Sequence, residues 1–347
     1  MRAALFRKHG GPEVLEIAEV PDPVAGPGQV QVRVTAVGLN HIDLFLRQGL
    51  PALHVELPHV SGGDVCGQVA AIGAGVSGVA IGDRVLVNPG LSCGHCQACL
   101  AGRDNFCPQG MLLGEQCWGG CAELVVVPRA NLVPVPRASV PLDDTALAAV
   151  PIAFVTAWQM LVERAVVRPG ETVLVLAAGS GVGTAAIQIA KLFGARVIAT
   201  ASTDEKLQRA RALGADEVIN YRAHDMVAEV KRLTARRGAD VVVEHVGAAT
   251  FPKSVVAAAR GGRIVTCGAT DGFEPVLNLR HVFYRQLSIL GSTLASKARL
   301  FEIVSLMAAG KLRPIVDRVL PLAEIGDAHR LLESRAVFGK VVLAVGV

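Results

Sequence analysis

The chain has 347 residues, enough for about two domains that each bury a hydrophobic core. Hydrophobic residues make up 51% of the chain, but they occur in short blocks broken by glycine and proline, as is typical of a packed α/β protein. The net charge is only +4, and aromatic residues make up 4% and do not interleave with basic clusters. The sequence therefore offers little for base stacking, and nucleic acid is not an expected partner.

The location of the protein is inferred from what its apolar segments lack. The uncharged stretch 173–190 contains three glycines and a glutamine that mark a turn, so a strand, a turn and a helix are expected there and not a membrane span. The N-terminal "MRAALFRKHGGPEV" holds an apolar run too short for a signal peptide. The densest basic stretch, Lys231 to Arg237, falls at an expected helix end and predicts a solvated face. We expect a cytoplasmic protein that does not bind membranes.

The first 150 residues are predicted to be mostly β. Apolar and polar residues alternate over 30–35, and short β-rich blocks follow at 84–87 and 123–127. The pattern of predicted elements changes after "SVPLDDTALAAV", where Asp143 can cap a helix.

Strands and helices alternate from this point on, which predicts a parallel, doubly wound sheet with right-handed crossovers. The tail after about Ser292 adds two helical stretches and a last strand, "GKVVLAV". The expected strands cover 172–176, 196–200, 217–219, 241–244, 263–266 and 287–290, and the expected helices 183–193, 203–213, 225–233 and 251–259.

The segment "VLVLAAGSGVGTAAIQIAKLFGA" is the strongest signal for a dinucleotide. An apolar strand, a turn of small residues and an amphipathic helix opening at Gly183 would let the backbone approach a pyrophosphate. The strict G-x-G-x-x-G pattern is not met, because Ala178 and Ser180 replace its first two glycines. A tight turn without a ligand is the alternative interpretation. The residues predicted to bind the cofactor here are Ser180, Gly181, Val182 and Gly183.

The choice of dinucleotide depends on the end of the second strand of this sheet. An acidic residue there would hold the ribose 2′-hydroxyl of NAD, but "RVIATASTDEKL" has Ala201 in that place. Ser202, Thr203 and Lys206 can donate to a 2′-phosphate instead, so NADPH is expected rather than NADH. Ser202 to Glu205 also fits a helix capping box, and Asp204 lies within the helix start.

Four cysteines, Cys93, Cys96, Cys99 and Cys107, lie within the lobe at 90–107. Disulfides are disfavoured in a reducing cytosol, whereas four thiolates suit a tetrahedral zinc ion. Gly94 and Gly102 would let the loop fold back on itself. A zinc held by four protein ligands has no open position, so one structural zinc is expected per subunit.

The chain resembles the zinc-type medium-chain alcohol dehydrogenases over nearly its whole length, on the segments "GDRVLVNPGLSCGHCQAC", "VLVLAAGSGVGTAAIQIAK" and "RQLSILGST". The resemblance implies an α/β protein with a GroES-like, β-rich catalytic domain and a Rossmann dinucleotide-binding domain. The expected divisions are 1–152 for the first domain, 153–292 for the second and 293–347 for a tail that rejoins the first.

Catalysis in that family uses a second zinc ion, and this sequence departs from its ligand pattern. Asn40 in "VGLNHIDLF" replaces the cysteine ligand, Gly63 in "PHVSGGDVCG" replaces the histidine, and Pro151 in "AAVPIAFVTAW" lies where a later cysteine would be. The family's glutamate after the histidine is Asp64 here, and the proton-relay positions hold Ile42 and Phe45. The usual route to alcohol deprotonation is therefore expected to be closed.

"NHIDLFLRQG" and "PIAFVTAWQML" resemble instead the quinone oxidoreductase branch, which lacks the catalytic metal and reduces activated double bonds with NADPH. Such a reductase needs the nicotinamide near an electrophilic carbon and a donor for the developing oxyanion. Asn40 is the candidate donor, with a hydrogen-bonded turn residue as the alternative. Asp43 is expected to orient Asn40 or the neighbouring loop, or else to pair with Arg47 one helical turn away.

Further cofactor contacts are implied by the resemblance. They are Tyr221 near the adenosine phosphate, Val246, Gly247, Gly268 and, by the pyrophosphate, Lys340. Tyr221 could equally be a surface aromatic residue and Lys340 a solvated charge at a strand end. His41 and His59 lie near the altered ligand positions and are expected to be loop histidines that face solvent.

The sequence therefore predicts an NADPH-dependent reductase of quinones, enones or related activated carbonyl compounds, forming a homodimer or homotetramer. One alternative is an alcohol dehydrogenase whose catalytic zinc is held by Asp64, Cys66, His41 or His59. A crystallin-like protein that binds NADPH without turnover is the alternative from another class.

Overall fold

The structure is a computed structural model that describes residues 1–49 and 55–346. It divides the chain into two compact units, one of residues 1–152 with 296–347 and the other of residues 153–295. Within the described part of the chain, no helix combines the length and the apolar character needed to cross a membrane.

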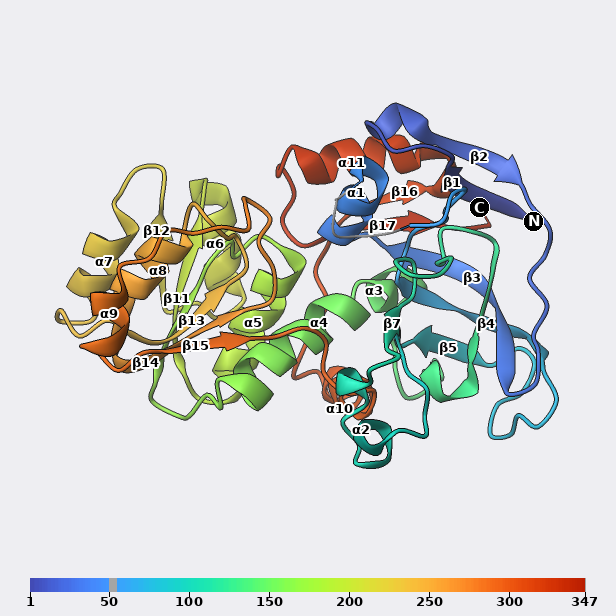
Figure 1. Cartoon of the computed structure of the whole chain (residues 1–347), viewed down its shortest axis with the longest axis horizontal. Coiled ribbons are helices and arrows are strands. Elements are labelled where there is room, and N and C mark those ends of the chain that lie inside the picture. The colour runs from blue at the N-terminus through green and yellow to red at the C-terminus, as the bar shows by residue number, and fades with distance from the viewer. Residues whose placement is uncertain (50–54, 347) are drawn as a thin grey trace. The chain divides into compact units, whose positions relative to one another are not determined.

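The first unit is built on a seven-stranded sheet in the order β16-β17-β3-β4-β5-β9, with β8 added beside β3 (Figure 1). The pairs are antiparallel except for β16 with β17. Valine and leucine side chains of β3, β4 and β17 form its core with Ala328 and Leu332 of the C-terminal helix. Its strands are β1 (Arg2–Phe6), β2 (Leu15–Glu19), β3 (Gln29–Gly38), β4 (Asp64–Ile72), β5 (Arg84–Val87), β6 (Gly90–Leu91), β7 (Met111–Leu112), β8 (Leu124–Pro128), β9 (Leu132–Pro134), β16 (Val316–Pro321) and β17 (Lys340–Ala344).

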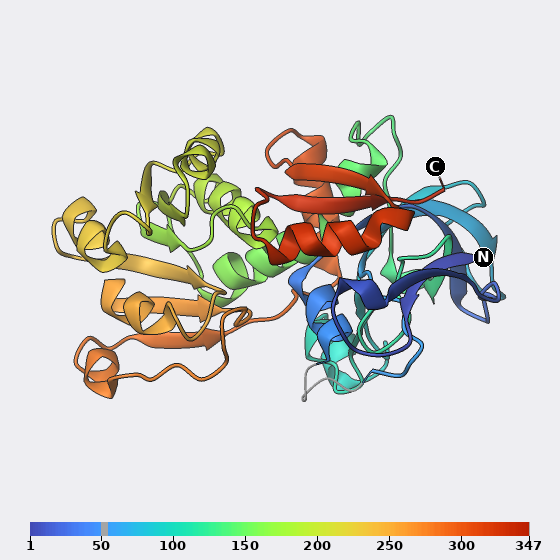
Figure 2. The same cartoon turned by 90° about the horizontal axis from the view of Figure 1, so that it is seen from above.

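The C-terminal segment completes this sheet, as expected from the resemblance. The red part of Figure 2 shows α11 lying along β16 and β17, and β17 pairs with β3 from the N-terminal half of the chain. The expected β blocks at 30–35, 84–87 and 123–127 all form strands, and Asp143 caps α3 by accepting from the Ala146 N–H at 2.7 Å. The helices of this unit are α1 (His41–Gln48), α2 (Gln97–Leu100), α3 (Asp144–Ala148), α10 (Ala298–Ala308) and α11 (Ile325–Glu333), with short 3-10 turns at Pro12–Val14, Asp104–Phe106, Arg129–Asn131 and Leu322–Glu324.

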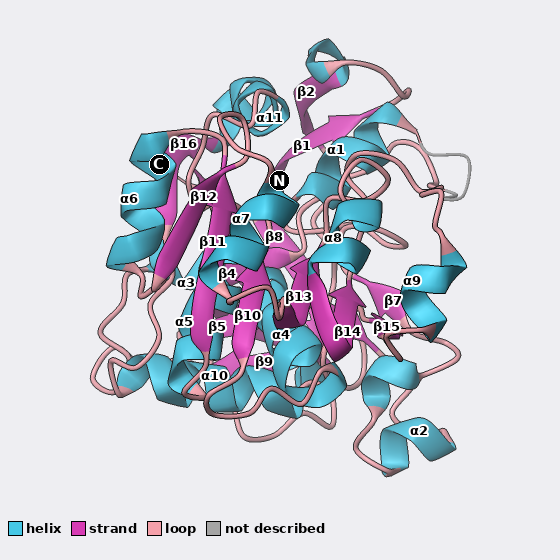
Figure 3. Ribbon diagram, turned by 90° about the vertical axis from the view of Figure 1, so that its left-hand side faces the viewer, coloured by secondary structure: helices cyan, strands magenta, loops and turns pink. Residues whose placement is uncertain are grey.

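The second unit is a doubly wound parallel sheet in the order β12-β11-β10-β13-β14-β15. This is the Rossmann strand order, so the predicted fold class is confirmed. Figure 3 shows α7 and α8 on one face of the sheet. The strands are β10 (Thr172–Val175), β11 (Arg196–Ala201), β12 (Glu217–Asn220), β13 (Ala239–Glu244), β14 (Ala258–Thr266) and β15 (Ser288–Gly291). The helices are α4 (Pro151–Trp158), which starts at the unit boundary and continues as a π-helical turn (Gln159–Arg164), α5 (Gly181–Leu192), α6 (Asp204–Ala212), α7 (Met226–Leu233), α8 (Phe251–Ala257) and α9 (Leu279–Phe283).

Buried aliphatic runs explain why β10 and β13 lie in the middle of the sheet. Val173, Leu174 and Val175 of β10 and Val241, Val242 and Val243 of β13 have no exposed surface. Strands covered by helices on both faces need such continuous apolar runs. The ends of β10 and β13 therefore lie side by side, and the loops that follow them meet at one edge of the sheet.

Candidate functional site

A buried polar cluster joins Asn40, Asp64 and Lys340 in the first unit. The Lys340 ammonium donates to Asp64 Oδ2 at 2.8 Å and to Asn40 Oδ1 at 2.6 Å. Asn40 Nδ2 donates to the same Asp64 oxygen at 2.9 Å, and the Ile152 N–H donates to Asp64 Oδ1 at 2.7 Å. Asp64 has no exposed surface and Lys340 retains 4%. The two buried charges satisfy each other, as charges removed from water must.

Asp43 fixes the backbone on which this cluster is built. It lies in the first turn of α1, and its Oδ2 accepts from the Asn40 N–H at 2.7 Å. Its Oδ1 accepts from the Gly62 N–H at 2.9 Å. One carboxyl group therefore contacts both Asn40 and the loop before β4, the two elements that it was expected to orient. The alternative pairing with Arg47 is wrong, because Arg47 binds Glu333 of α11 instead.

The positions that correspond to the family's catalytic zinc ligands cannot hold a metal as they stand. Asn40 is engaged by Asp64 and Lys340, and Pro151 begins α4. A Cβ atom at Gly63 would lie 2.8 Å from the Leu113 carbonyl oxygen, so a histidine there would require the backbone to move. In the family, a cysteine and a histidine occupy the places of Asn40 and Gly63.

Of the alternative zinc ligands, Asp64 and His59 are engaged elsewhere. His59 is buried and its Nε2 lies 3.0 Å from the Gly114 carbonyl oxygen, so the expectation that it faces solvent is wrong. His41 is half-buried at the start of α1, and burial lowers its pKa. Burial raises the pKa of the Cys66 thiol to about 12, which keeps it protonated at neutral pH. Together with Asp64, these residues do not form a metal-binding group in the described part of the chain.

Lys340 differs from the solvated charge that the sequence allowed. It is the first residue of β17, and its side chain is buried against residues about 300 positions earlier in the chain. An ammonium group has three N–H donors, and Asn40 and Asp64 take two of them. Asn40 Nδ2, the donor expected to bind an oxyanion, is directed to Asp64 and at 3.4 Å to the Gly38 carbonyl oxygen. The positive charge of the cluster therefore comes from Lys340.

The four predicted cysteines form a metal-binding group. The Sγ atoms of Cys93, Cys96, Cys99 and Cys107 all lie within 4.8 Å of one another, and the recorded Sγ–Sγ distances run from 3.5 to 3.9 Å. A tetrahedral zinc with bonds of about 2.3 Å would separate its sulfurs by about 3.8 Å. The donor set therefore fits zinc, and four protein ligands would fill its coordination shell.

The backbone of the cysteine lobe is shaped for this geometry. Gly94 and Gly102 have φ of +78° and +70°, as the predicted fold-back requires. The Cys96 N–H donates to the Cys93 sulfur at 3.4 Å, and N–H donors from His95 and Cys96 lower the Cys93 thiol pKa to about 6. Lys297, just before α10, anchors the lobe through Asp104, with Nζ to Oδ2 at 3.4 Å.

In the second unit, the predicted cofactor residues all lie at the carboxyl ends of the parallel strands. Each segment follows the carboxyl end of a parallel strand, where dinucleotides bind in this architecture. They are Ser180, Gly181, Val182 and Gly183 after β10, Ser202, Thr203 and Lys206 after β11, Tyr221 after β12, Val246 and Gly247 after β13, and Gly268 after β14. Lys340 belongs to the other unit.

The turn after β10 is tight. Helix α5 begins at Gly181, two residues before the expected opening, because the Ser180 Oγ accepts from the Gly183 N–H at 2.9 Å and caps the helix. The same Oγ lies 3.0 Å from His245 Nε2, which ties the turn to the loop after β13. A Cβ atom at Gly183 would lie 2.4 Å from the Ala177 carbonyl oxygen, so only glycine fits here. This is the close helix–strand packing that the third glycine of the dinucleotide fingerprint provides.

Glu244 organises the loop that contains Val246 and Gly247, and sequence reasoning missed it. Its side chain is fully buried at the end of β13 and accepts from the Val246 and Gly247 N–H groups at 2.8 and 3.1 Å. The Ser254 hydroxyl of α8 donates to its other oxygen at 2.5 Å. The signal in the sequence was a single carboxylate that ends the apolar run "DVVVE". A buried acid must find donors, and here they come from the cofactor loop.

Strand β11 ends at Ala201 and so has no carboxylate where an acidic residue would bind the ribose 2′-hydroxyl of NAD. Ala201 is buried, and the cap of α6 is Thr203, whose Oγ1 accepts from the Lys206 N–H at 3.4 Å. The capping box expected at Ser202 is therefore wrong by one residue. Asp204 starts the helix and accepts from Asn220 Nδ2 at 2.9 Å. Tyr221 is 49% exposed, which leaves its ring accessible.

We predict that Asp43→Asn destabilises the protein in a pH-dependent way. An amide can accept from only one of the two N–H groups, so at neutral pH the free energy of unfolding should fall by about 1–3 kcal/mol. Burial raises the Asp43 pKa to about 6, above its unfolded value of 3.8. The stability that this titration contributes is thus full below about pH 4 and lost as the pH rises through about 6.

Urea unfolding of both proteins at pH 4.5 and pH 7 checks this prediction. The difference in unfolding free energy between wild type and variant should be larger at pH 4.5 by about 1–3 kcal/mol. A difference that is unchanged or larger at pH 7 would contradict the assigned burial of an ionisable Asp43.

Comparisons with known proteins place the chain in a family. A model described as "Alcohol dehydrogenase GroES-like domain" matches residues 26–137, and one described as "Zinc-binding dehydrogenase" matches residues 181–309. An "NAD-dependent alcohol dehydrogenase" of Sulfurisphaera tokodaii is 32% identical over 99% of both chains. The human "Quinone oxidoreductase" is 29% identical over 99% of this chain and 97% of its own.

Solved structures agree with these sequence matches. A crystal structure of an NAD-dependent alcohol dehydrogenase has a TM-score of 0.95 and 57% identity, with both chains fully covered. A thermostable alcohol dehydrogenase from Pyrobaculum aerophilum has a TM-score of 0.90 and 35% identity over 99% of each chain. The present chain has the GroES-like and Rossmann units, matches both family models and aligns with these relatives over its full length. It therefore belongs to the medium-chain dehydrogenase/reductase superfamily, as an oxidoreductase of the alcohol dehydrogenase and quinone oxidoreductase type.

Proposed function

We propose that this oxidoreductase uses NADPH to reduce quinones, enones or related activated carbonyl compounds without a catalytic zinc ion. One observation carries the proposal: of the positions that hold the family's catalytic metal, Asn40 is bound in a buried cluster with Lys340 and Asp64, and Gly63 has no room for a side chain. The names of the relatives point both ways, because they include quinone oxidoreductases and alcohol dehydrogenases.

The charge of the cluster favours activated substrates over simple alcohols. An alcohol must lose its hydroxyl proton as it gives up hydride, and a catalytic zinc makes this feasible by lowering the pKa of the bound oxygen. Lys340 and Asp64 together carry no net charge, so the cluster cannot supply that effect. An enone or quinone takes up hydride directly and needs only stabilisation of the oxyanion that forms. The third N–H of Lys340 is the donor we assign to that oxyanion, and Asp64 and Asn40 hold Lys340 in place.

The second unit offers a fitting site for the dinucleotide. Gly183 and Gly247 both lie where a Cβ atom would collide with neighbouring backbone, at 2.4 and 2.5 Å, so the turn after β10 and the loop after β13 can pack tightly only with glycine there. When bound, NADPH supplies the hydride. Ser180 to Gly183 would hold the pyrophosphate, and Glu244 keeps the Val246–Gly247 loop in position. Ser202, Thr203, Lys206 and Tyr221 would bind the 2′-phosphate.

A zinc ion in the cysteine lobe would serve structure only, since four thiolates leave it no open position.

We also propose a homo-oligomer. The edge strand β15 and the neighbouring α9 expose apolar side chains, with Ile289, Leu279 and Phe283 at 42%, 67% and 59% exposure. Exposed apolar groups beside an open sheet edge are typical of an interface with a second copy. A single monomeric species in light scattering would contradict this.

Cofactor choice is tested by Ala201→Asp. A carboxylate at the end of β11 would repel a 2′-phosphate and accept from a 2′-hydroxyl. We expect kcat/KM to favour NADPH in the wild type and the ratio to move toward NADH by tenfold or more in the variant. Glu217→Asp, a conservative change at the opposite end of the neighbouring strand, is the control. A wild-type enzyme that already prefers NADH, as relatives named NAD-dependent alcohol dehydrogenase suggest, would contradict the proposal.

Reaction type is tested with the double variant Asp64→Asn, Lys340→Met. It removes both charges at once and so leaves no unpaired buried ion, which single variants would. We expect the wild type to oxidise NADPH with a quinone or enone during brief chelator treatment and to leave ethanol unreacted. The variant should lose at least tenfold in kcat at unchanged Kd for NADPH.

The outcomes separate the alternatives. Loss of NADPH affinity without loss of kcat would assign Lys340 to the pyrophosphate. Alcohol oxidation that the chelator abolishes would favour the zinc alcohol dehydrogenase, and tight NADPH binding with no turnover would favour the crystallin-like protein.

A further inference from the structure

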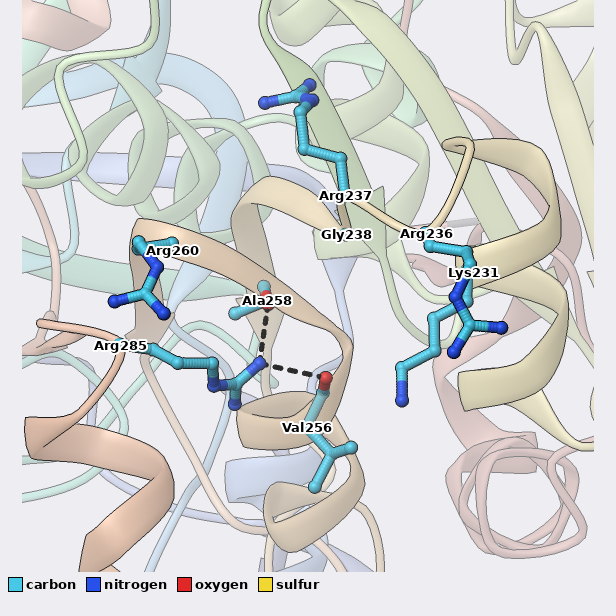
Figure 4. Close-up of a pocket in the computed structure, with 8 residues that line it drawn as sticks. All are labelled: Lys231, Arg236, Arg237, Gly238, Val256, Ala258, Arg260 and Arg285. Carbon is cyan, nitrogen blue, oxygen red and sulfur yellow. Dashed lines mark hydrogen bonds between the residues drawn. The ribbon is translucent and has the colours of Figure 1, made fainter.

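A cavity of about 330 Å³ in the second unit is lined by five basic side chains (Figure 4). This volume corresponds to about ten water molecules, at the lower end of the range for small-molecule pockets. The remaining lining residues are glycine, alanine and valine, and no acidic residue lines the cavity. The basic residues are Lys231, Arg236, Arg237, Arg260 and Arg285.

The cavity lies at the amino ends of the parallel strands, whereas the predicted cofactor residues lie at their carboxyl ends. Gly238 immediately precedes β13, Arg260 is near the start of β14, and Arg285 comes shortly before β15. These are the amino ends of parallel strands, whereas the dinucleotide turn and the loop after β13 follow carboxyl ends. A ligand of this cavity would therefore be independent of the cofactor.

Four of the five cations lack a carboxylate partner. Arg237 is paired with Asp240, and in Figure 4 its side chain points away from the other basic groups. In the described part of the chain, no ion pair engages Lys231, Arg236, Arg260 or Arg285. The net charge of the whole chain is only +4, which equals the charge of these four side chains alone. Uncompensated cations in a recess attract anions.

Two of these cations are held by structure. Arg285 donates through Nη1 to the carbonyl oxygens of Val256 and Ala258 at 3.1 and 2.8 Å, and Arg260 Nη1 donates to the Tyr284 carbonyl oxygen at 2.7 Å. Burial, followed by repulsion from Arg260, lowers the pKa of Arg285. Placing two guanidinium groups against each other costs free energy, which a bound anion would recover.

The opposite wall is a strained turn. Ala235 and Arg236 have φ of +48° and +68°, a conformation that costs residues with a side chain about 1 kcal/mol each. Thr234 locks the turn, since its Oγ1 donates to the Val230 carbonyl oxygen at 2.6 Å and accepts from the Gly238 N–H at 2.9 Å. The strain places Arg236 beside Lys231, across from Arg260 and Arg285 in Figure 4. The basic stretch 231–237 is largely exposed, as predicted, and three of its side chains also line the cavity.

We propose that Lys231, Arg236, Arg260 and Arg285 form a binding site for a small anion with two adjoining phosphate groups, such as a diphosphate or the diphosphate of a nucleotide. Arg236 and Arg260 can bind phosphate oxygens in pairs, whereas Arg285, whose guanidinium already donates to four backbone carbonyl oxygens, contributes its charge. Four cations exceed what one orthophosphate can neutralise. A nucleic acid is not favoured, because the charge is confined to a small recess and no aromatic residue lines it.

Calorimetry with inorganic pyrophosphate on the full-length protein, saturated with NADPH to block the dinucleotide site, tests this proposal. We expect about one pyrophosphate per subunit, bound more tightly than orthophosphate and more weakly as salt is added. The double variant Lys231→Ala, Arg236→Ala should weaken binding at least tenfold, while Arg211→Ala on α6 should leave it unchanged. Quinone reduction should be the same in all three proteins.

Each result decides the matter. Equal affinity for pyrophosphate and ADP identifies the diphosphate as the ligand, and tighter ADP binding identifies a nucleotide. The proposal is overturned if pyrophosphate does not bind, if orthophosphate binds as tightly, or if the double variant binds as the wild type does. Because the readout is binding at a site away from the cofactor loops, these results are separate from any failure of the proposed reductase activity.

Discussion

The buried pair of Lys340 and Asp64 is the interaction on which the first unit's site depends. Each charge was taken out of water, a cost that only mutual pairing and further hydrogen bonds can offset. Asp64 meets that requirement through Lys340, Asn40 and the Ile152 N–H. The pair thereby joins the start of β4, the start of β17, the residue before α1 and the start of α4.

In the function that we propose, this arrangement also sets the chemistry of the site. A zinc ion brings two positive charges to a bound oxygen, whereas the cluster brings one ammonium already balanced by a carboxylate. Such a group can stabilise an oxyanion that forms on an activated carbonyl compound, but it cannot make a simple alcohol acidic. Asp43 and Gly62 contribute indirectly, because they fix the backbone from which Asn40 and Asp64 extend.

Much of the fold could be predicted from the sequence because its signals are local. The strand at 84–87 and the alternating elements from 172 onward form where apolar runs, caps and glycine turns indicate them. Strand β16 was missed, because all six of its residues are only partly buried or exposed, Val319 among them, and no alternating pattern marks it. The cysteine lobe could be predicted for the same reason as the turn after β10: its spacing is a short-range pattern.

The site could be predicted only in part, because its decisive contacts are long-range. Lys340 was expected by the pyrophosphate or else as a solvated charge at a strand end, since nothing in "FGKVVL" indicates a carboxylate 276 residues earlier. Arg47 was paired with Asp43 by helical spacing, but Glu333 of α11 supplies a partner from the far end of the chain. His59 and Glu244 are buried for reasons that only the assembled sheets provide. In each case the local pattern was present and a tertiary contact prevailed over it.

The measurement that tests the central claim most directly is the zinc content per subunit of the purified protein, by elemental analysis. About one zinc ion per subunit, lost when Cys93, Cys96, Cys99 and Cys107 are changed to serine, is the result that the account predicts. About two zinc ions per subunit, with one retained in that variant, would contradict it, because the second zinc ion would need a set of ligands that the described residues outside the cysteine lobe do not form.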